Sequence, residues 1–295
     1  MKGWILGLLL MTMSLVGGEG NASLSWRAAM LGYDGEGWKI LLYEGESGKS
    51  HPLTTEEEPH GFDYDFRRER AIYSDAMGRV HLLEEGRERI LPLPKTDGYI
   101  QPSFDCSGER VYLVELPGHS SRAARIVAVD LKTGAKEIAV EQTSAQLEPV
   151  GADGGRSLIY TSLSCNRGCG GLLQEIWRMD TVHGRSEQLT LLNAFSSNPA
   201  VHAGDPRVYF SSNRGGHYHI WSLLPGKRCG EKELTHGEAT DAFPAPLGQG
   251  DFLFLRSDAQ GDRLMRGGRS GRSEALPLDP AYRQLRQLKV DRCTP

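Results

Sequence analysis

IWSLLPGKRCGEKELT (residues 220–235) is an apolar strand-forming run, a turn marked by Pro, Gly and charged residues, and a second strand that ends in Leu-Thr. Five further stretches follow the same plan, at residues 40–54, 80–93, 126–140, 176–190 and 264–278. The six copies start 40, 46, 50, 44 and 44 residues apart. A period of about 20 to 50 residues is typical of chains that repeat one supersecondary unit, so this pattern decides the fold.

A second block, which opens on a proline, precedes four of these hairpins. The prolines are Pro102, Pro149, Pro199 and Pro244. A Gly- or Asp-rich turn follows each of them, and then an apolar strand with an aromatic residue. These aromatics are Tyr112, Tyr160, Tyr209 and Phe254, and Tyr73 matches them one unit earlier. Because proline cannot donate a ladder hydrogen bond, we expect it at the first residue of a strand.

Each unit therefore reads as four antiparallel strands, of which the hairpin forms the outer two. Six such units predict an all-β fold, a six-bladed β-propeller of four-stranded antiparallel blades. The first unit lacks a clear proline block, and we expect residues 24–33 to supply its inner strands. The tail, residues 281–291, has two interpretations: an extra strand that closes the ring, or a short amphipathic helix, since Leu285 and Leu288 also fit helical spacing.

The N-terminus predicts export. Lys2 is followed by an apolar run over residues 4–16 and then by small residues, as in a secretory signal peptide. We expect residues 1–20 to be the signal peptide, cleaved between Gly18 and Asn21, and residues 21–295 to form one propeller domain in the periplasm or outside the cell. The formal net charge is −4, and the sequence contains no long run of charges of one sign. We therefore expect no nucleic-acid partner and no stable membrane insertion after cleavage.

The five cysteines suit an exported chain, in which disulfides are stable. Cys165 and Cys169 flank a turn-like insert, and a small loop-closing disulfide between them is the favoured interpretation. The sequence does not decide how Cys106, Cys229 and Cys293 pair.

Catalytic motifs fit poorly. The stretch over residues 45–50 has Gly-Lys-Ser but lacks the four-residue spacing of a phosphate-binding loop, and no Gly-x-Ser-x-Gly elbow occurs. The sequence predicts no cofactor.

The units around residues 189–223 and 234–262 resemble a known repeat. Asp241 and Pro244, the Ser-Asn-Arg-Gly run at 212–215, and Ile220 with Trp221 occupy its main positions. The chain is similar to the TolB-like six-bladed propellers, whose repeat is shared with prolyl-oligopeptidase-type propellers. The resemblance implies the fold over about residues 24–290. The α/β domain that precedes the propeller in TolB is not expected here.

The positions just before the inner strands predict a working surface. In a propeller these loops converge on one mouth of the central channel, where ligands and partners usually bind. The candidate binding residues are Tyr99, Gln101, Gln146, Glu148, Ser197, Asn198, Asp241 and Phe243. The first functional hypothesis is thus a non-enzymatic exported propeller that binds a protein, peptide or cell-envelope partner at this mouth.

Two alternatives remain open. His217 and His219 are two residues apart, and on a strand they would project from one face. With His202 or His236 they would form a metal site, as in some similar polysaccharide lyases, and the chain would be a metal-assisted carbohydrate lyase or hydrolase. The other alternative is an accessory subunit whose activity lies in a neighbouring protein.

Overall fold

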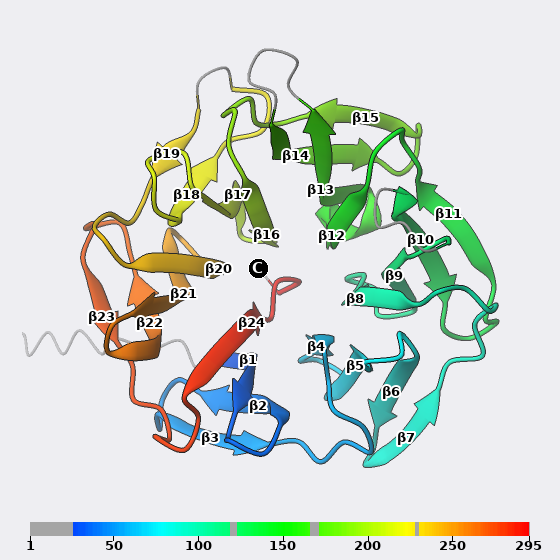
Figure 1. Cartoon of the computed structure of the whole chain (residues 1–295), viewed down its shortest axis with the longest axis horizontal. Coiled ribbons are helices and arrows are strands. Elements are labelled where there is room, and N and C mark those ends of the chain that lie inside the picture. The colour runs from blue at the N-terminus through cyan, green and yellow to red at the C-terminus, as the bar shows by residue number, and fades with distance from the viewer. Residues whose placement is uncertain (1–25, 119–122, 166–170, 228–229, 295) are drawn as a thin grey trace, which may run out of the picture.

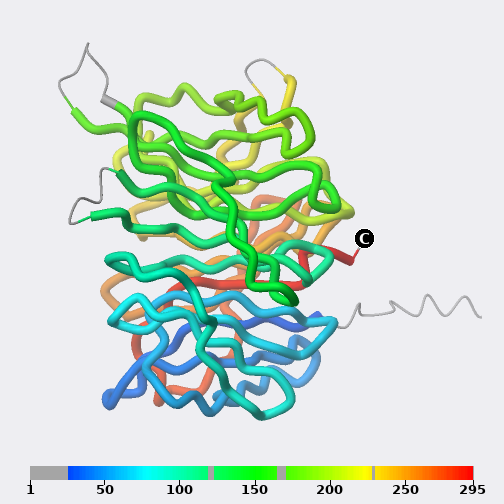
Figure 2. The backbone as a smooth tube through the Cα atoms, turned by 90° about the vertical axis from the view of Figure 1, so that its right-hand side faces the viewer, coloured from blue at the N-terminus to red at the C-terminus, as the bar shows by residue number. Residues whose placement is uncertain are grey.

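A computed structural model describes residues 26–118, 123–165, 171–227 and 230–294. They form six four-stranded antiparallel sheets arranged as a ring (Figure 1), which confirms the predicted all-β propeller. Figure 2 shows the ring from its side, with the C-terminus on one face. Within the described residues no helix has the length and apolarity needed to cross a membrane.

Blades 2, 3 and 4 are each continuous in sequence and follow one another over residues 61–188. Blade 2 contains β4 (Gly61–Asp65), β5 (Arg70–Ser74), β6 (Val80–Glu84) and β7 (Arg87–Ile90). Blade 3 contains β8 (Tyr99–Phe104), β9 (Arg110–Glu115), β10 (Arg125–Asp130) and β11 (Lys136–Val140). Blade 4 contains β12 (Gln146–Ala152), β13 (Ser157–Cys165), β14 (Leu172–Asp180) and β15 (Arg185–Gln188), with the one-turn 3₁₀ helix η2 (Asp153–Gly155) between its first two strands.

Two more blades follow, and one blade joins the two ends of the chain. Blade 5 contains β16 (Ser196–His202), β17 (Asp205–Ser212), β18 (His219–Leu223) and β19 (Lys232–Glu233). Blade 6 contains β20 (Thr240–Gly248), β21 (Asp251–Asp258), β22 (Gly261–Gly267) and β23 (Ser273–Ala275). Blade 1 contains β1 (Arg27–Tyr33), β2 (Trp38–Glu44), β3 (Lys49–Pro52) and, as its innermost strand, β24 (Gln284–Val290).

The tail is a closing strand rather than a helix. β24 pairs antiparallel with β1, from Ala28 opposite Val290 to Tyr33 opposite Gln284. The expectation for residues 24–33 is therefore half correct: they supply the second strand of blade 1, while its inner strand comes from the other end of the chain. The pairing with β24 covers the edge of β1, which would otherwise be an open sheet edge of the kind that invites aggregation.

The repeated hairpins are the outer halves of the blades, as expected. Their first strands are β2, β6, β10, β14, β18 and β22, and these are mostly buried. The strands that follow them are short and largely exposed, as in β15, where all four residues are exposed. The hairpin pattern therefore predicts the architecture, but the hairpins themselves lie away from the centre of the ring.

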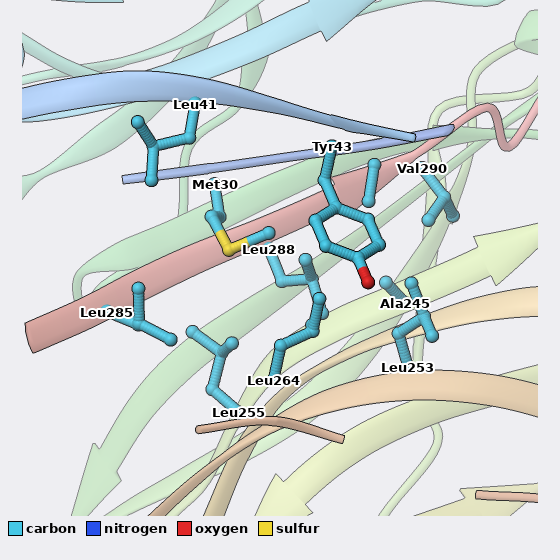
Figure 3. Packing of buried hydrophobic residues seen from close by; sticks show 11 residues of the cluster. Met30, Leu41, Tyr43, Ala245, Leu253, Leu255, Leu264, Leu285, Leu288 and Val290 are labelled. Atoms are coloured by element: carbon cyan, nitrogen blue, oxygen red, sulfur yellow. The ribbon is translucent and has the colours of Figure 1, made fainter. Parts of the chain in front are cut away.

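The hydrophobic core is divided among the blade interfaces. The described residues form six clusters of buried side chains, and each cluster joins two neighbouring blades. The cluster between blades 6 and 1 packs Leu253 and Leu264 against Met30 and Tyr43, with Leu288 of β24 between them (Figure 3). Full burial of one such side chain contributes about 1.5–3 kcal/mol. The aromatic residues of the repeat are buried in these interfaces: Tyr73, Tyr112, Tyr160, Tyr209 and Phe254.

The repeat prolines are not the first residues of the inner strands, so the sequence prediction of their position is wrong. In β8 the pairing with β9 skips from Ile100 to Ser103, so Gln101 and Pro102 stand in a bulge in the middle of the strand. The same skip occurs at Pro149, Pro199 and Pro244. A bulge leaves a residue out of the ladder, and there a proline costs no hydrogen bond.

Candidate binding site in the central cavity

The inner strands enclose a cavity of about 280 Å³ at the centre of the ring. Its wall takes residues from the inner strands of all six blades. They include Phe62, Gln101, Glu148, Asn198, Phe243, Gln287, Lys289 and the four repeat prolines, with Arg292 just beyond β24. A cavity of this size holds a side chain or a chain end rather than a folded domain.

The bulge gives the wall its repeating geometry. The residue before each repeat proline has a positive φ, between 51° and 55°, and Gln287 of β24 has the same conformation at φ 56° without a proline after it. A left-handed conformation at a non-glycine residue costs about 1–3 kcal/mol, and such strain gathers at functional sites. The bulge places one polar or aromatic side chain per strand at the cavity: Gln101, Glu148, Asn198, Phe243 and Gln287.

Three of these side chains fasten neighbouring blades together. The Gln101 Oε1 accepts a 2.9 Å hydrogen bond from the backbone N–H of Glu148, and the Glu148 Oε2 accepts one of 2.8 Å from the N–H of Asn198. The Gln287 Oε1 accepts from the N–H of Phe62 at 3.0 Å. We call this contact the bulge clasp. It holds the inner strands in register with one another and fixes the polar groups of the wall.

Glu148 is the most heavily engaged carboxylate of the wall. Besides the clasp, its Oε1 accepts from Asn198 Nδ2 at 2.9 Å, and its Oε2 accepts from Thr161 Oγ1 and from Gln174 Nε2, both at 3.3 Å. Burial raises the pKa of Glu148, against the lowering effect of the hydrogen bonds from Asn198 and Thr161 and of the Lys289 charge. A raised pKa makes this carboxyl group easier to neutralise than an ordinary surface glutamate.

Arg292 is a buried cation at the other end of the cavity, and its charge is paired, while its Nε has no hydrogen-bond partner among the described residues. Its guanidinium forms a two-pronged ion pair with Asp63, at 3.2 Å and 2.9 Å, and it also donates to Ser103 Oγ at 3.3 Å and to the Phe104 carbonyl. Burial alone would raise the pKa of Asp63, but the charges of Arg292 and Lys289 hold it below the usual value.

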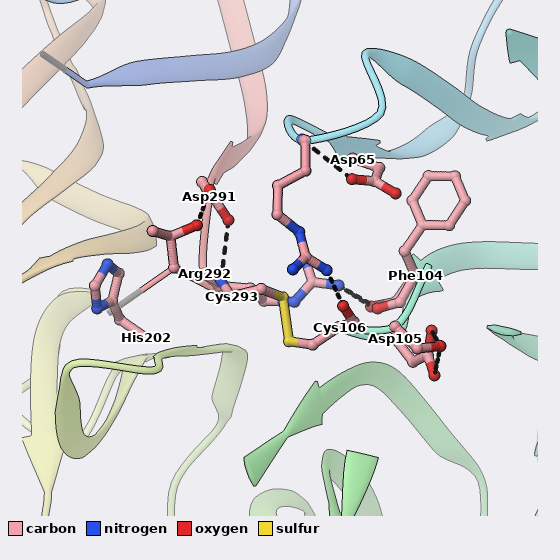
Figure 4. The surroundings of a disulfide bond; sticks show 12 residues. Asp65, Phe104, Asp105, Cys106, His202, Asp291, Arg292 and Cys293 are labelled. Atoms are coloured by element: carbon pink, nitrogen blue, oxygen red, sulfur yellow. Dashed lines mark hydrogen bonds between the residues drawn. A yellow bond between two sulfur atoms is a disulfide. The ribbon is translucent and has the colours of Figure 1, made fainter. Parts of the chain in front are cut away.

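The residues after β24 close one mouth of the cavity. Cys293 forms a disulfide with Cys106, 187 positions earlier, beyond the end of β8 (Figure 4). The Arg292 carbonyl accepts a 2.8 Å hydrogen bond from the N–H of Ala203, between β16 and β17. Residues 291–294 therefore leave blade 1 and contact blades 2, 3 and 5, so they cross the axis of the ring. We call this segment the tail plug.

The open mouth lies where the inner strands begin, on the side that the sequence predicted as the binding surface. Four of the predicted residues line the cavity itself: Gln101, Glu148, Asn198 and Phe243. The other four do not line it. Ser197 is next to a cavity position and faces the opposite way. Tyr99, Gln146 and Asp241 each lie two residues before a bulge position, and the bulge re-aims the side chains that follow it, so regular alternation does not continue across it.

Each of these four residues has a structural partner. Tyr99 is buried and hydrogen-bonds the Pro94 carbonyl at 2.9 Å. Gln146 is buried and accepts from the N–H of Gln142 at 3.1 Å. Asp241 is buried and pairs with Arg256 at 2.7 Å and 2.8 Å. Ser197 is partly buried and donates to Asn198 Oδ1 at 3.4 Å.

Sequence reasoning missed the cavity residues supplied by the tail. Gln287, Lys289 and Arg292 all belong to the segment with two interpretations, and no proline marks it. A usable signal exists: with Gln287 aligned to the bulge position, Lys289 takes the place of Ser103, Val150, Ala200 and Ala245 in the other blades. Small or apolar residues fill that place elsewhere, and a lysine there is the exception.

The cysteine prediction is only partly accessible. The bond between Cys106 and Cys293 settles two of the three cysteines whose pairing the sequence left open. Cys169 and Cys229, and the side chain of Cys165, lie outside the described residues, as does the predicted signal peptide. The disulfide between Cys165 and Cys169 therefore stays a prediction.

The histidines of the second hypothesis do not form a ligand set. β18 begins at His219, so His217 lies in the preceding turn rather than on the strand. His219 is buried and His217 exposed, with ring centroids 6.5 Å apart. Across the described residues no group of three or more His, Cys, Asp or Glu side chains is placed to hold a metal ion. The metal-assisted hypothesis therefore gains no support.

Comparisons with known proteins concern the fold. No family model matches the chain, and no curated protein matches it in sequence. TolB from Acinetobacter baumannii superimposes with a TM-score of 0.71 at 15% identity, over 90% of this chain and 66% of that chain. A TolB structure from Agrobacterium tumefaciens gives 0.66 at 14% identity, over 90% and 99%. This chain thus spans about two thirds of the Acinetobacter TolB.

Other solved structures share the propeller. A chain of a Nidogen/Laminin complex gives a TM-score of 0.69 at 10% identity, over 92% of this chain and 100% of that chain. A prolyl endopeptidase gives 0.57 at 14% identity, over 86% and 43%. The chain therefore has a TolB-like six-bladed propeller fold, and the predicted link to prolyl-oligopeptidase propellers is also found.

Proposed function

We propose that this chain is an exported, non-catalytic propeller that binds a protein, peptide or cell-envelope partner at the open mouth of its central cavity. The observation that carries the proposal is the wall itself. Strained bulge residues at equivalent places of five inner strands line one cavity, and bulge clasps hold three of those positions in place. A rigid, prearranged wall loses little entropy when a ligand binds.

The closed end of the cavity supports a binding role at the other end. The tail plug crosses one mouth and is fixed by a disulfide, so a partner reaches the cavity from the side where the inner strands begin. The fold neighbours fit the proposal: one matching chain comes from a complex of two proteins, nidogen and laminin.

Export to the periplasm or to the outside of the cell belongs to the same proposal. The apolar run over residues 4–16 fits a signal peptide, and a disulfide in the tail plug fits an oxidising compartment. Cell fractionation with N-terminal sequencing of the mature protein tests it. A new N-terminus between Gly18 and Asn21 in the exported fraction is the expected result. An uncleaved chain in the cytoplasm would contradict it.

Affinity capture from cell envelopes tests the binding proposal. The bait is compared with an Asn198→Ala variant, which removes a polar group of the wall, and with Glu137→Gln, a change on the exposed outer strand β11. We expect mass spectrometry to identify a partner that Asn198→Ala loses and Glu137→Gln keeps. Partners captured equally by all three baits would contradict a site in the cavity.

A further inference from the structure

Lys289 is the one charged group of the cavity wall without a direct partner among the described residues. It is partly buried and lines the cavity. The two carboxylates whose charges act on it are Asp63 and Glu148, and no hydrogen bond or ion pair joins either of them to Lys289. An ammonium group has three N–H donors, so its hydrogen-bonding capacity on this side of the wall is unused.

Both nearby carboxylates are already committed to other groups. Asp63 accepts two bonds from Arg292 and one of 2.8 Å from the N–H of Phe104. Glu148 accepts from Asn198, Thr161 and Gln174. Moving either of them onto Lys289 would leave a buried donor unpaired, at a cost comparable to the gain. The unsatisfied group of the wall is therefore a cation.

A second unused donor lines the same cavity. The Gln101 amide oxygen is held by the clasp to Glu148, and its NH₂ group has no hydrogen-bond partner among the described residues. The wall thus offers an ammonium and an amide N–H₂, both of which donate. The rest of the wall combines apolar side chains, those of Phe62, Phe243 and the prolines, with polar side chains that are already hydrogen-bonded, those of Glu148, Asn198 and Gln287. Such a surface fits a ligand that has one negatively charged group able to accept hydrogen bonds and is otherwise uncharged.

The charge of the cavity selects a monoanion. A dianion such as a phosphate would face Glu148 and would also lie near the negative charge of Asp63, which is buried behind the wall, and the guanidinium that could bind it in two-pronged fashion, that of Arg292, already holds Asp63. A carboxylate carries one charge, and two oxygens that can accept from the ammonium and the amide together. The cavity volume of about 280 Å³ suits a chain end or a single side chain.

We infer that Lys289 binds a carboxylate of the partner, supplied either by the free C-terminus of a peptide segment or by an Asp or Glu side chain that enters the cavity from the open mouth. This inference rests on the proposed function and adds the chemistry by which the partner is recognised. It also explains the lysine at a position filled by small or apolar residues in blades 3 to 6. Burial lowers the pKa of Lys289, and an anion beside it would raise that pKa again.

Fluorescence anisotropy with labelled pools of random pentapeptides tests the inference. The first pool has a free C-terminal carboxylate, the second a C-terminal amide and no Asp or Glu, and the third a C-terminal amide with one Asp. The proteins are wild type, Lys289→Met, and Lys132→Met, which removes an exposed lysine between β10 and β11. Affinity for the first or third pool, about tenfold or more weaker in Lys289→Met and unchanged in Lys132→Met, is the expected result.

The first and third pools also identify the source of the carboxylate. Affinity for the first alone assigns a C-terminus, and affinity for the third assigns a side chain. Equal affinity for the second pool, or equal affinity of wild type and Lys289→Met, would overturn the inference. So would the failure of wild type to bind either carboxylate pool.

A measurement on wild type alone guards against misfolding of the variant. The Lys289 side-chain resonance is followed by NMR while the binding pool is added. A shift supports the contact, and no shift at saturation overturns it. Envelope capture that depends on Asn198 would leave the proposed function standing even if the carboxylate inference failed.

Discussion

Lys289 and Arg292 are two cations three residues apart in the same C-terminal segment, yet only the charge of Arg292 has a direct ion-pair partner among the described residues. Arg292 is enclosed by Asp63, Ser103 and Phe104 at the plugged end of the cavity, with its charge and four of its hydrogen bonds accounted for. Lys289 lines the cavity and has no direct partner among the described residues. A buried charge that is paired serves the fold, and one that is left unpaired has capacity for a ligand. The following experiments separate these two roles.

The largest effect is expected from Asp63→Ala. It leaves the Arg292 guanidinium buried without its counter-ion, and breaking one side of such a pair costs about 3–5 kcal/mol. Urea unfolding of the oxidised protein measures the change. Glu137→Ala is the control, since it removes the acceptor of an exposed pair with Arg110 and should cost less than about 1 kcal/mol. Equal losses in the two variants would show that Arg292 is not a structural cation.

Loss of the disulfide ranks next. Cys106→Ser or Cys293→Ser frees a crosslink between positions 187 apart, and removal of a native disulfide costs about 2–5 kcal/mol. The two single variants should lose the same amount, and reduction of wild type should match them. Unequal losses would mean that one cysteine also contributes to stability through its packing.

A smaller, pH-dependent effect separates the carboxylates of Glu148 and Asp63. The pKa of Glu148 is raised above its usual 4.5, so the unfolded chain releases this proton first as pH rises. Wild type should therefore lose stability relative to Glu148→Gln from about pH 4.5 upward, until the folded carboxyl has ionised. Denaturation of both proteins at stepped pH measures this difference.

Asp63 changes the stability of the fold in the opposite direction with pH, and at lower pH. Its pKa is lowered from 3.8, so its contribution is present at neutral pH and is lost as pH falls below that value.

A stability difference between wild type and Glu148→Gln that stays flat above pH 4.5 would contradict the prediction for Glu148. It would show that the Glu148 carboxylate is as well solvated in the fold as in the unfolded chain.

The smallest effect on stability is expected from Lys289→Met. The methionine keeps the length of the stem and removes a charge that has no ion-pair partner, so the free energy of unfolding should stay the same or rise. Differential scanning calorimetry measures it. A loss as large as that of Asp63→Ala would mean that Lys289 is a second structural cation, and the comparison with Arg292 would no longer hold.

Periodicity explains how much the sequence could predict. Each blade carries its own hairpin and aromatic strand, so local pattern was enough for the fold and for four of the cavity residues, Gln101, Glu148, Asn198 and Phe243. The bulge was missed because a proline reads the same at the start of a strand and inside a bulge. Local pattern does not decide ring closure, because β24 pairs with β1, some 250 residues away, and a repeat carries no information about which ends meet. Lys289 lies in that segment.

The position of β24 also sets an order on how the molecule can be made. β1 has no inner neighbour until residues 284–290 exist, so the first blade to emerge is the last to be completed. Until then the edge of β1 is open to other strands. For a chain that crosses a membrane N-terminus first, the propeller reaches its final state only after its last strand has crossed. The disulfide between Cys293 and Cys106 can form only after the C-terminal segment has crossed as well.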